Sequence, residues 1–256
     1  MDTISDLDII VGVARAIHHN MSYLQTVSVT DVMAESCFRN PAIEFLERRH
    51  NSEEFKIFLE QVHPVFKSKR IDLAWGKGID KKDKIVMPTT FLEMKYVKEE
   101  TADGSEIQRY FNDLTRLAIL CSNFDANSNK DYNCYFLASG NWLYWNTCFK
   151  QFSDKNKKDF ISPVKVNAER KSDLISSDYS NWLSFNLMDY ERIIHTSDYK
   201  SPYFDEFCEH YVLRSSDAKP DPNQNFSFRT QLLWLSESEP ELTNATVTGL
   251  WKICGI

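Results

Sequence analysis

The first part of the chain carries apolar residues at helical spacing. Residues 4–24 predict an amphipathic helix, because their apolar side chains fall three or four positions apart. The inward-facing positions of this helix are Ile10, Val13, Ala14 and Ile17. A second helical region is expected from about Thr30. Within it, Asn40-Pro41 predicts the start of a short helix, since Asn is a good N-cap and Pro suits the first helical position. Its inward side chains would be Ala42, Phe45 and Leu46.

A third helix is predicted after Ser52, which is a suitable N-cap residue. Its apolar side chains would share one face, and they are Phe55, Phe58, Leu59 and Val62. His63-Pro64 ends this segment, because the residue before a proline disfavours the helical conformation.

From Arg70 the pattern changes to that of strands. Residues 70–75 predict a short strand, residues 76–83 a charged turn, and residues 85–97 a second strand interrupted near Pro88. A helix then opens at Ser105, where Ser105-Glu106-Ile107-Gln108 matches a capping box. The apolar stripe of this helix is Ile107, Phe111, Leu114, Ala118 and Cys121.

The remaining segments predict a mixture of strands and helices. A strand is expected at 132–138, and the aromatic run 142–149 would extend the sheet. Two segments look helical, at 181–195 and 202–213. Two further strands, joined by an acidic turn in the manner of a hairpin, are predicted at 226–235 and 243–253.

Composition excludes several classes of protein. With 42% hydrophobic residues, 17 Phe, 11 Tyr and 6 Trp, the chain can build a core and is not disordered. No apolar run is long enough to span a bilayer, and the acidic start lacks a secretory signal, so we expect a cytoplasmic protein without membrane contact. The seven glycines form neither common nucleotide-binding loop, and no CxxC pair indicates a zinc site.

Charge is distributed unevenly along the chain. The net charge is −7, yet residues 64–100 and 150–171 are locally basic. A nucleic acid could therefore meet a local basic face of an acidic protein. The acidic C-terminal half, residues 172–256, instead suits a protein partner.

The residues that carry chemistry lie in the two predicted strands. Asp72 stands between Ile71 and Leu73, where an unpaired carboxylate would be costly to bury. Glu93 and Lys95 are two positions apart and so share one face of the second strand. If the strands pair, the two carboxylates converge beside the lysine. Together with the backbone carbonyl of Met94, they would suit Mg²⁺, or Mn²⁺, and hence phosphodiester hydrolysis with Lys95 orienting the attacking water.

These residues resemble the signature of the PD-(D/E)xK nuclease superfamily. The resemblance covers roughly residues 40–140, with Ile71-Asp72 in the first strand and Glu93-Met94-Lys95 in the second. Ile71 stands where the family name has proline. The resemblance implies a restriction-endonuclease-like α/β core, with a mixed central sheet flanked by helices. It also implies an acid on the preceding helix, Glu44 or Glu47, of which Glu44 would support a second metal ion, and a catalytic polar residue on the following helix, Gln108.

The resemblance further implies an organisation and a substrate. Residues 1–150 would form the nuclease core with its N-terminal helices, and residues 151–256 a C-terminal α+β extension or a continuation of the same domain. The expected activity is that of a DNA endonuclease of restriction or anti-phage defence type, acting on double-stranded DNA as a homodimer or larger assembly. Phosphate contacts are expected from the lysine-rich segments 77–84 and 150–158.

Other interpretations of the same residues stay open. Asp72 would also be explained by an ion pair with Arg70 or Lys95, and Glu93 and Lys95 by a solvated sheet face. Gln108 would be explained by capping of Ser105 alone. Two other functions are compatible with these alternatives: a catalytically silent nuclease-fold protein that serves as a binding or assembly module, and a carboxylate glycosidase, in which Lys95 has no natural role.

Overall fold

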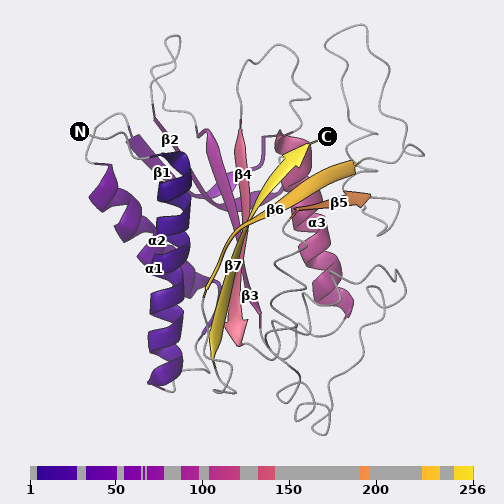
Figure 1. The fold of residues 1–256 in the computed structure, drawn as a ribbon. Helices are drawn as coiled ribbons and strands as arrows, with labels where there is room; N and C mark the ends of the chain where they lie inside the picture. The colour runs from indigo at the N-terminus through magenta and orange to yellow at the C-terminus, as the bar shows by residue number, and fades with distance from the viewer. Residues whose placement is uncertain are drawn as a thin grey trace, which may run out of the picture.

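The computed structural model describes residues 5–27, 33–50, 55–64, 66, 68–77, 88–97, 104–121, 132–141, 191–195, 227–236 and 245–255. Figure 1 shows this part of the chain as a central sheet with helices on its two sides. The helices are α1 (Asp6–Thr26), α2 (Ser36–Arg49) and α3 (Gly104–Cys121). None of these helices is long and apolar enough to cross a membrane. The strands are β1 (Phe55–Val62), β2 (Arg70–Lys77), β3 (Thr90–Val97), β4 (Asn133–Asn141), β5 (Glu191–His195), β6 (Ser227–Leu235) and β7 (Thr246–Gly255).

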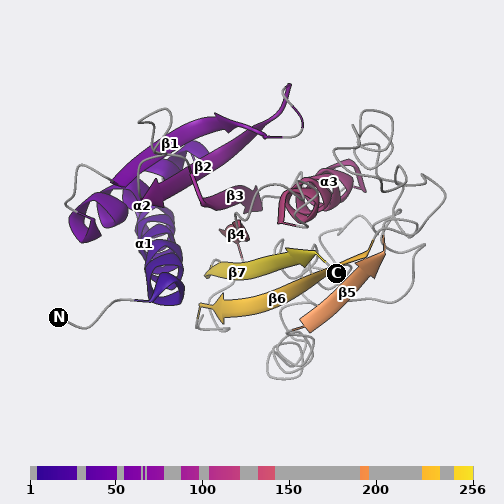
Figure 2. The same ribbon diagram turned by 90° about the horizontal axis from the view of Figure 1, so that it is seen from above.

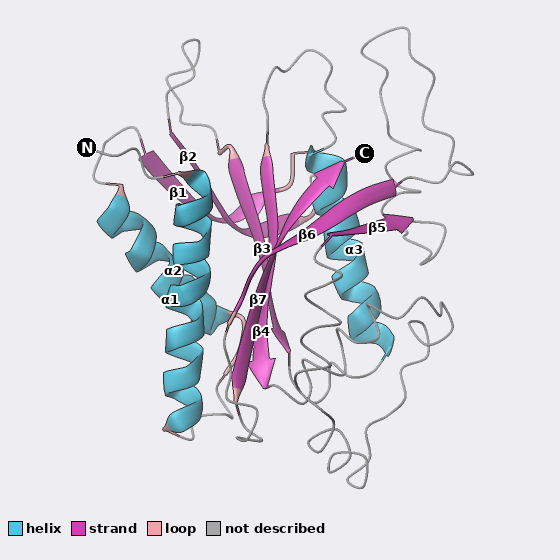
Figure 3. Cartoon of the chain, in the orientation of Figure 1, coloured by secondary structure: helices cyan, strands magenta, loops and turns pink. Residues whose placement is uncertain are grey.

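The strands form one mixed sheet in the order β1-β2-β3-β4-β7-β6-β5. β3 and β4 are parallel neighbours, and helix α3 lies between them in the chain as the crossover connection. All other neighbouring strands pair antiparallel. Strands from the C-terminal half thus extend the sheet that the N-terminal half begins (Figure 3). The chain is therefore an α/β protein with a mixed sheet flanked by helices, as the sequence predicts.

Each face of the sheet buries its own apolar cluster. On one face, α1 and α2 pack against residues of β2, β3 and β4 that include Leu73, Leu92 and Leu137. On the other face, α3 packs against a cluster that includes Phe91 and Phe136. Seen from above, α1 and α2 lie on the opposite side of β3 and β4 from α3 (Figure 2). This two-layer covering explains why β3 is buried on both faces for most of its length.

The first predicted helix is confirmed as α1. Ser5 caps it, because its hydroxyl accepts the Asp8 N–H while the Asp8 carboxylate accepts the N–H and the hydroxyl of Ser5. The predicted inward positions are all buried, namely Ile10, Val13, Ala14 and Ile17. The hydrophobic period therefore located this helix correctly.

The predicted start of the second helix at Asn40-Pro41 is wrong. α2 begins at Ser36, and Pro41 lies inside it. A proline there cannot donate to the carbonyl of Cys37, one turn earlier. The side-chain amide of Asn20, from α1, donates to that carbonyl at 3.1 Å instead. The tertiary contact thus replaces the lost helical hydrogen bond, and Ala42 and Leu46 are buried as expected.

The helix predicted after Ser52 is also wrong, because residues 55–62 form strand β1. β1 pairs antiparallel with β2 from Phe55↔Lys77 to Val62↔Arg70. Its apolar side chains divide between the two faces of the sheet: Ile57 packs on the α1–α2 side and Phe58 on the α3 side. A short apolar run fits either period, and pairing with β2 decides in favour of the strand.

The later predictions are mixed in outcome. The strands expected at 70–75, 85–97 and 132–138 correspond to β2, β3 and β4, and the helix opening near Ser105 corresponds to α3. The C-terminal hairpin is confirmed by the antiparallel pairing of β6 with β7. Helix is wrong for the end of 181–195, where Glu191–His195 is strand β5, paired with β6. The predictions for 142–149 and 202–213 lie outside the described residues.

Candidate functional site

The candidate site lies where β2 and β3 separate. The two strands pair from Trp75↔Thr90 to Leu73↔Leu92. Beyond that point β2 continues along β1, and β3 continues along β4. Asp72 and Glu93 are the first residues past the last pair. The split therefore opens inside the sheet, between its second and third strands, with charged side chains at its apex, where the two strands separate.

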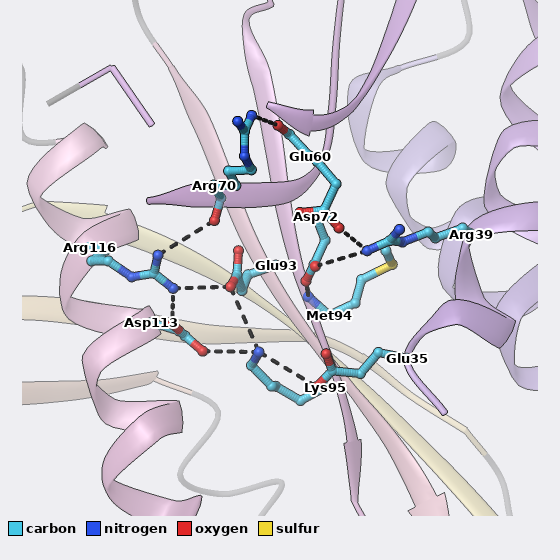
Figure 4. A network of polar contacts seen from close by, with 10 residues as sticks. All are labelled: Glu35, Arg39, Glu60, Arg70, Asp72, Glu93, Met94, Lys95, Asp113 and Arg116. Carbon is cyan, nitrogen blue, oxygen red and sulfur yellow. Dashed lines mark hydrogen bonds and ion pairs between the residues drawn. The ribbon is translucent and has the colours of Figure 1, made fainter. Parts of the chain in front are cut away.

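Asp72, Glu93 and Lys95 meet at this split, as the sequence predicts (Figure 4). The Met94 N–H donates to Asp72 Oδ2 at 2.8 Å, so the Asp72 side chain replaces a backbone partner between the strands. Lys95 Nζ lies 3.8 Å from Glu93 Oε1, on the face that both side chains share. The three side chains are largely buried, with 14%, 6% and 15% of their surface exposed.

Helix α3 contributes a buried pair of opposite charges to the same cluster. Arg116 Nη2 lies 3.1 Å from Glu93 Oε1 and also bonds the Asp113 carboxylate. Asp113 Oδ2 in turn lies 3.1 Å from Lys95 Nζ. Glu93 and Lys95 are therefore each held by a residue of opposite charge from α3. Such contacts fix the positions of long side chains that would otherwise sample several rotamers.

A buried histidine supports the backbone of α3 at this point. His63 Nε2 donates to the Arg116 carbonyl at 3.2 Å, and its Nδ1 accepts the Phe66 N–H at 3.1 Å. These partners require the neutral imidazole. Burial accordingly lowers the pKa of His63 to about 4, against the opposing effect of its bond to the Arg116 carbonyl. The ring thus connects the β1–β2 turn to the turn of α3 that carries Arg116.

Charged residues from α2 and β1 line the other side of the split. Glu35, at the N-cap of α2, lies 3.5 Å from Lys95 Nζ through Oε1. Arg39 bonds the Glu60 carboxylate and lies 3.9 Å from Asp72 Oδ1. Arg70 Nη1 donates to the Glu60 carbonyl at 3.0 Å. The whole cluster holds five acidic side chains, Glu35, Glu60, Asp72, Glu93 and Asp113, and four basic ones, Arg39, Arg70, Lys95 and Arg116.

Burial and mutual repulsion make the carboxylates at the apex hard to ionise. Burial raises the pKa of Glu93 to about 7, and the neighbouring Asp72 adds to this, whereas Lys95 and Arg116 oppose it. Burial also raises the pKa of Asp72, although Lys95 and the Met94 N–H favour its charged form. Because both carboxyls are less acidic than usual, a further cation between them would be favourable.

Lys95 stays protonated in this setting. Burial alone lowers the pKa of Lys95, but the carboxylates of Glu93, Glu35 and Asp72 together raise it above its usual value. Burial likewise raises the pKa of Glu35, against the attraction of Lys95. The ammonium group is therefore a hydrogen-bond donor and a positive charge rather than a proton acceptor.

The oxygen atoms at the apex suit a hard divalent cation. Asp72 and Glu93 supply carboxylates, and the Met94 carbonyl faces the same gap, since the N–H and C=O of one strand residue lie on the same edge. This is the donor chemistry of Mg²⁺ sites, which use few protein oxygens and several waters. Among the residues described here, no group of three or more His, Cys, Asp or Glu side chains is already spaced to hold a metal ion.

The other residues predicted for the site lie elsewhere or outside the described part. Glu44 is exposed on α2, where its Oε2 lies 3.6 Å from Arg48 one turn later. Glu47 is also exposed on that helix. The acid that α2 brings to the cluster is Glu35 instead. The backbone of Gln108 belongs to α3, but its side chain is not among those described.

The sequence did not reveal five members of the cluster: Glu35, Arg39, Glu60, Asp113 and Arg116. Asp113 and Arg116 did leave a trace, because they lie one helical turn apart within an apolar helix, where unpaired charges are costly. Glu60 left none, since its segment reads as a helix. Glu35 falls in the helical region expected from about Thr30 but ahead of the helix start predicted at Asn40-Pro41, and the structure makes it the N-cap of α2.

Glu60 has a backbone conformation that is unusual for its residue type. Its φ is 49°, in the left-handed region that glycine adopts without strain. It belongs to β1 between Leu59 and Gln61, which pair with Leu73 and Ile71, so it stands across from Asp72. Strained residues of this kind are concentrated at functional sites.

Replacing Glu60 should separate this strain from the ion pair with Arg39. Glu60→Gly and Glu60→Ala both remove the carboxylate, but only glycine relieves the left-handed backbone. We expect Glu60→Gly to have the higher free energy of unfolding, by about 1 kcal/mol, measured by urea denaturation. At the exposed strand position Lys56, glycine should be the less stable of the same two replacements. If the alanine variant is the more stable of the two at position 60 as well as at position 56, the assignment of strain to Glu60 is contradicted.

No family model matches the chain, and neither the curated proteins nor the solved structures contain a match. Functional inference therefore depends on the chemistry of the cluster itself.

Proposed function

We propose that this chain is a metal-dependent nuclease that hydrolyses phosphodiester bonds in DNA, as an endonuclease of restriction or anti-phage defence type. The proposal is carried by one observation: Asp72, Glu93 and Lys95 converge at the split between β2 and β3. Two carboxylates with a lysine beside them suit the hydrolysis of a phosphate diester, and Lys95 would have no evident task in a glycosidase.

The arrangement of elements around the cluster supports the same proposal. The order α2, β1, β2, β3, α3, β4 places the aspartate strand and the E-x-K strand side by side, with a helix on each face. This is the arrangement expected from the resemblance to PD-(D/E)xK nucleases. We accordingly propose a restriction-endonuclease-like core. The finer assignment depends on the activity, because many functions share one fold.

Asp72, Glu93 and the Met94 carbonyl would hold Mg²⁺ or Mn²⁺. When bound, such an ion lowers the pKa of a water molecule and polarises a phosphoryl oxygen. Asp72 is oriented for this task by the Met94 N–H, and Glu93 by Arg116. Lys95, held by Asp113 and Glu35, would donate a hydrogen bond to the attacking water and stabilise the charge that develops on the phosphate.

The direct test is a cleavage assay with supercoiled plasmid DNA. We expect the wild-type chain to cut in Mg²⁺ or Mn²⁺ and to stop in EDTA. Asp72→Asn should lose the activity, because it removes the charge that faces the ion, whereas Asp6→Asn, an exposed change in the first turn of α1, should keep it. The proposal fails if the wild type does not cut with either ion, or if Asp72→Asn cuts as well as the wild type.

A second candidate is a binding or assembly module that keeps this architecture without catalysis. It is favoured by the pairing of Glu93 with Arg116 and of Lys95 with Asp113, which satisfies these charges within the protein. A module of this kind would show no metal binding that depends on Glu93. Calorimetric titration of wild type and Glu93→Gln with Mn²⁺ therefore separates the two candidates. Double-strand cutting would in addition call for two copies of the chain.

A further inference from the structure

Within the described part of the chain, the two sides of the charged cluster differ in their exposure to solvent. The α3 side is closed, since the side chains of Glu93, Asp113 and Arg116 are each less than 10% exposed. On the α2 and β1 side, by contrast, Arg39 is 32% exposed and Glu60 is 44% exposed. A molecule that reaches Asp72 and Lys95 would therefore enter past α2 and β1.

Glu60 holds two arginines at this opening. Its carboxylate bonds Arg39, which comes from α2, and its backbone carbonyl accepts a hydrogen bond from Arg70 Nη1 at 3.0 Å. Figure 4 shows the two guanidinium groups on either side of Glu60, with Asp72 below it. The left-handed backbone of Glu60 interrupts the regular pairing with β2 at this position. The strained residue thus orients two cations toward the entrance.

The chemistry of these two groups matches a phosphodiester backbone. A guanidinium has five N–H donors in a planar fork, which fits two oxygens of one phosphate. The contacts of Arg39 with Glu60 and Asp72 use Nη2, and the contact of Arg70 uses Nη1, so each fork keeps further donors for a ligand.

We propose that Arg39 and Arg70, oriented by Glu60, bind the backbone phosphates of the nucleic acid as it enters the site. The proposal rests on the proposed function for the identity of the ligand. It adds two arginines beside Asp72 to the expected phosphate contacts of the lysine-rich segments 77–84 and 150–158, which apart from Lys77 lie outside the described residues. Glu60 is then a positioning residue, because it acts through the arginines.

The test measures DNA binding without cleavage. The full chain is titrated in EDTA against a fluorescein-labelled duplex, and the dissociation constant is followed by anisotropy over a range of KCl concentrations. Each phosphate contact contributes about 0.9 to the slope of log K against log salt. We expect Arg39→Gln and Arg70→Gln each to lower that slope by about 1 and to weaken binding roughly 10-fold at low salt. Arg48→Gln, at an arginine of α2 that is 81% exposed, is the matched control and should bind as the wild type does.

The outcomes separate this proposal from the nuclease assignment. If the wild type cleaves DNA and both arginine variants keep its salt slope, phosphate binding by Arg39 and Arg70 (the arginine entrance) is wrong, and the nuclease assignment is retained. If the wild type binds DNA with a slope that falls in both variants but cleaves nothing, the entrance stands and the nuclease is wrong. A wild type that binds no duplex overturns the entrance outright. Arg39→Lys should retain part of the slope but lose affinity, since lysine keeps the charge without the fork.

Discussion

Replacing Lys95 with methionine should lower the rate of DNA cleavage roughly 10²–10³-fold, while the affinity for Mn²⁺ is retained or increased. The rate falls because the ammonium group no longer stabilises the charge that develops on the phosphate. The affinity does not fall, since removal of a cation next to Asp72 and Glu93 leaves both carboxylates more attractive to a metal ion. Single-turnover cleavage and calorimetry measure the two quantities.

Two controls make this result specific. Lys56→Met removes an exposed lysine from β1 and should leave both quantities unchanged. Circular dichroism must show that Lys95→Met is folded at the pH of the assay, because Glu35, Glu93 and Asp113 each lose an ion pair in that variant. If Lys95→Met is folded and cleaves at the wild-type rate, Lys95 has no role in catalysis.

Replacing Arg116 with methionine should cost about 3–5 kcal/mol of unfolding free energy at about pH 8 and clearly less at about pH 5.5. Arg116 is buried between Glu93 and Asp113, so its removal takes one of two nearby cations away from these buried carboxylates and leaves them only Lys95 among the described residues. The pH dependence follows from Glu93. Burial raises its pKa to about 7 in the folded state, above that of an ordinary glutamate, and the loss of Arg116 raises it further.

The sign of this effect is fixed by linkage. A carboxyl with a raised folded pKa takes up its proton more readily when folded, so the fold gains stability as the pH falls through that pKa toward the unfolded value. Neutral Glu93 no longer needs Arg116, and the cost of the variant shrinks. Urea denaturation at both pH values measures it, with Arg48→Met as the exposed control, for which we expect less than about 1 kcal/mol. An equal loss of unfolding free energy at both pH values would mean that the charge of Glu93 is not what Arg116 stabilises.

Sequence patterns predicted the meeting of Asp72, Glu93 and Lys95 better than they predicted the elements around these side chains. The Asp72 and Glu93-Met94-Lys95 strands could be predicted because each places charged groups among apolar neighbours at strand spacing. α1 and α3 could be predicted from long amphipathic periods. The structure brings Asp72 beside Glu93 as expected. Regular pairing of the two strands ends before these residues, and the hydrogen bond from the Met94 N–H to the Asp72 carboxylate links the strands there instead.

The errors share one cause, which is that tertiary contacts overrode local preference. β1 has a run of apolar residues that fits a helix, and its pairing with β2 makes it a strand. Pro41 signals a helix start, but Asn20 from α1 allows it inside α2. Each error affected a residue of the cluster: Glu60 was assigned to a helix, and Glu35 was placed ahead of the helix start predicted at Asn40-Pro41. Glu44 and Glu47 were named for the acid of this helix because the resemblance implies one there, and both are exposed.

The most direct measurement of the central claim is the position of a bound metal ion. Crystals of the chain grown with Mn²⁺ should show one anomalous peak in the split between β2 and β3, bound by Asp72, Glu93 and the Met94 carbonyl. The same peak should be absent from crystals of Asp72→Asn. If the ion binds elsewhere, or if Glu93 remains paired with Arg116 and the split contains no ion at saturating Mn²⁺, the cluster is a structural charge network and not a nuclease centre.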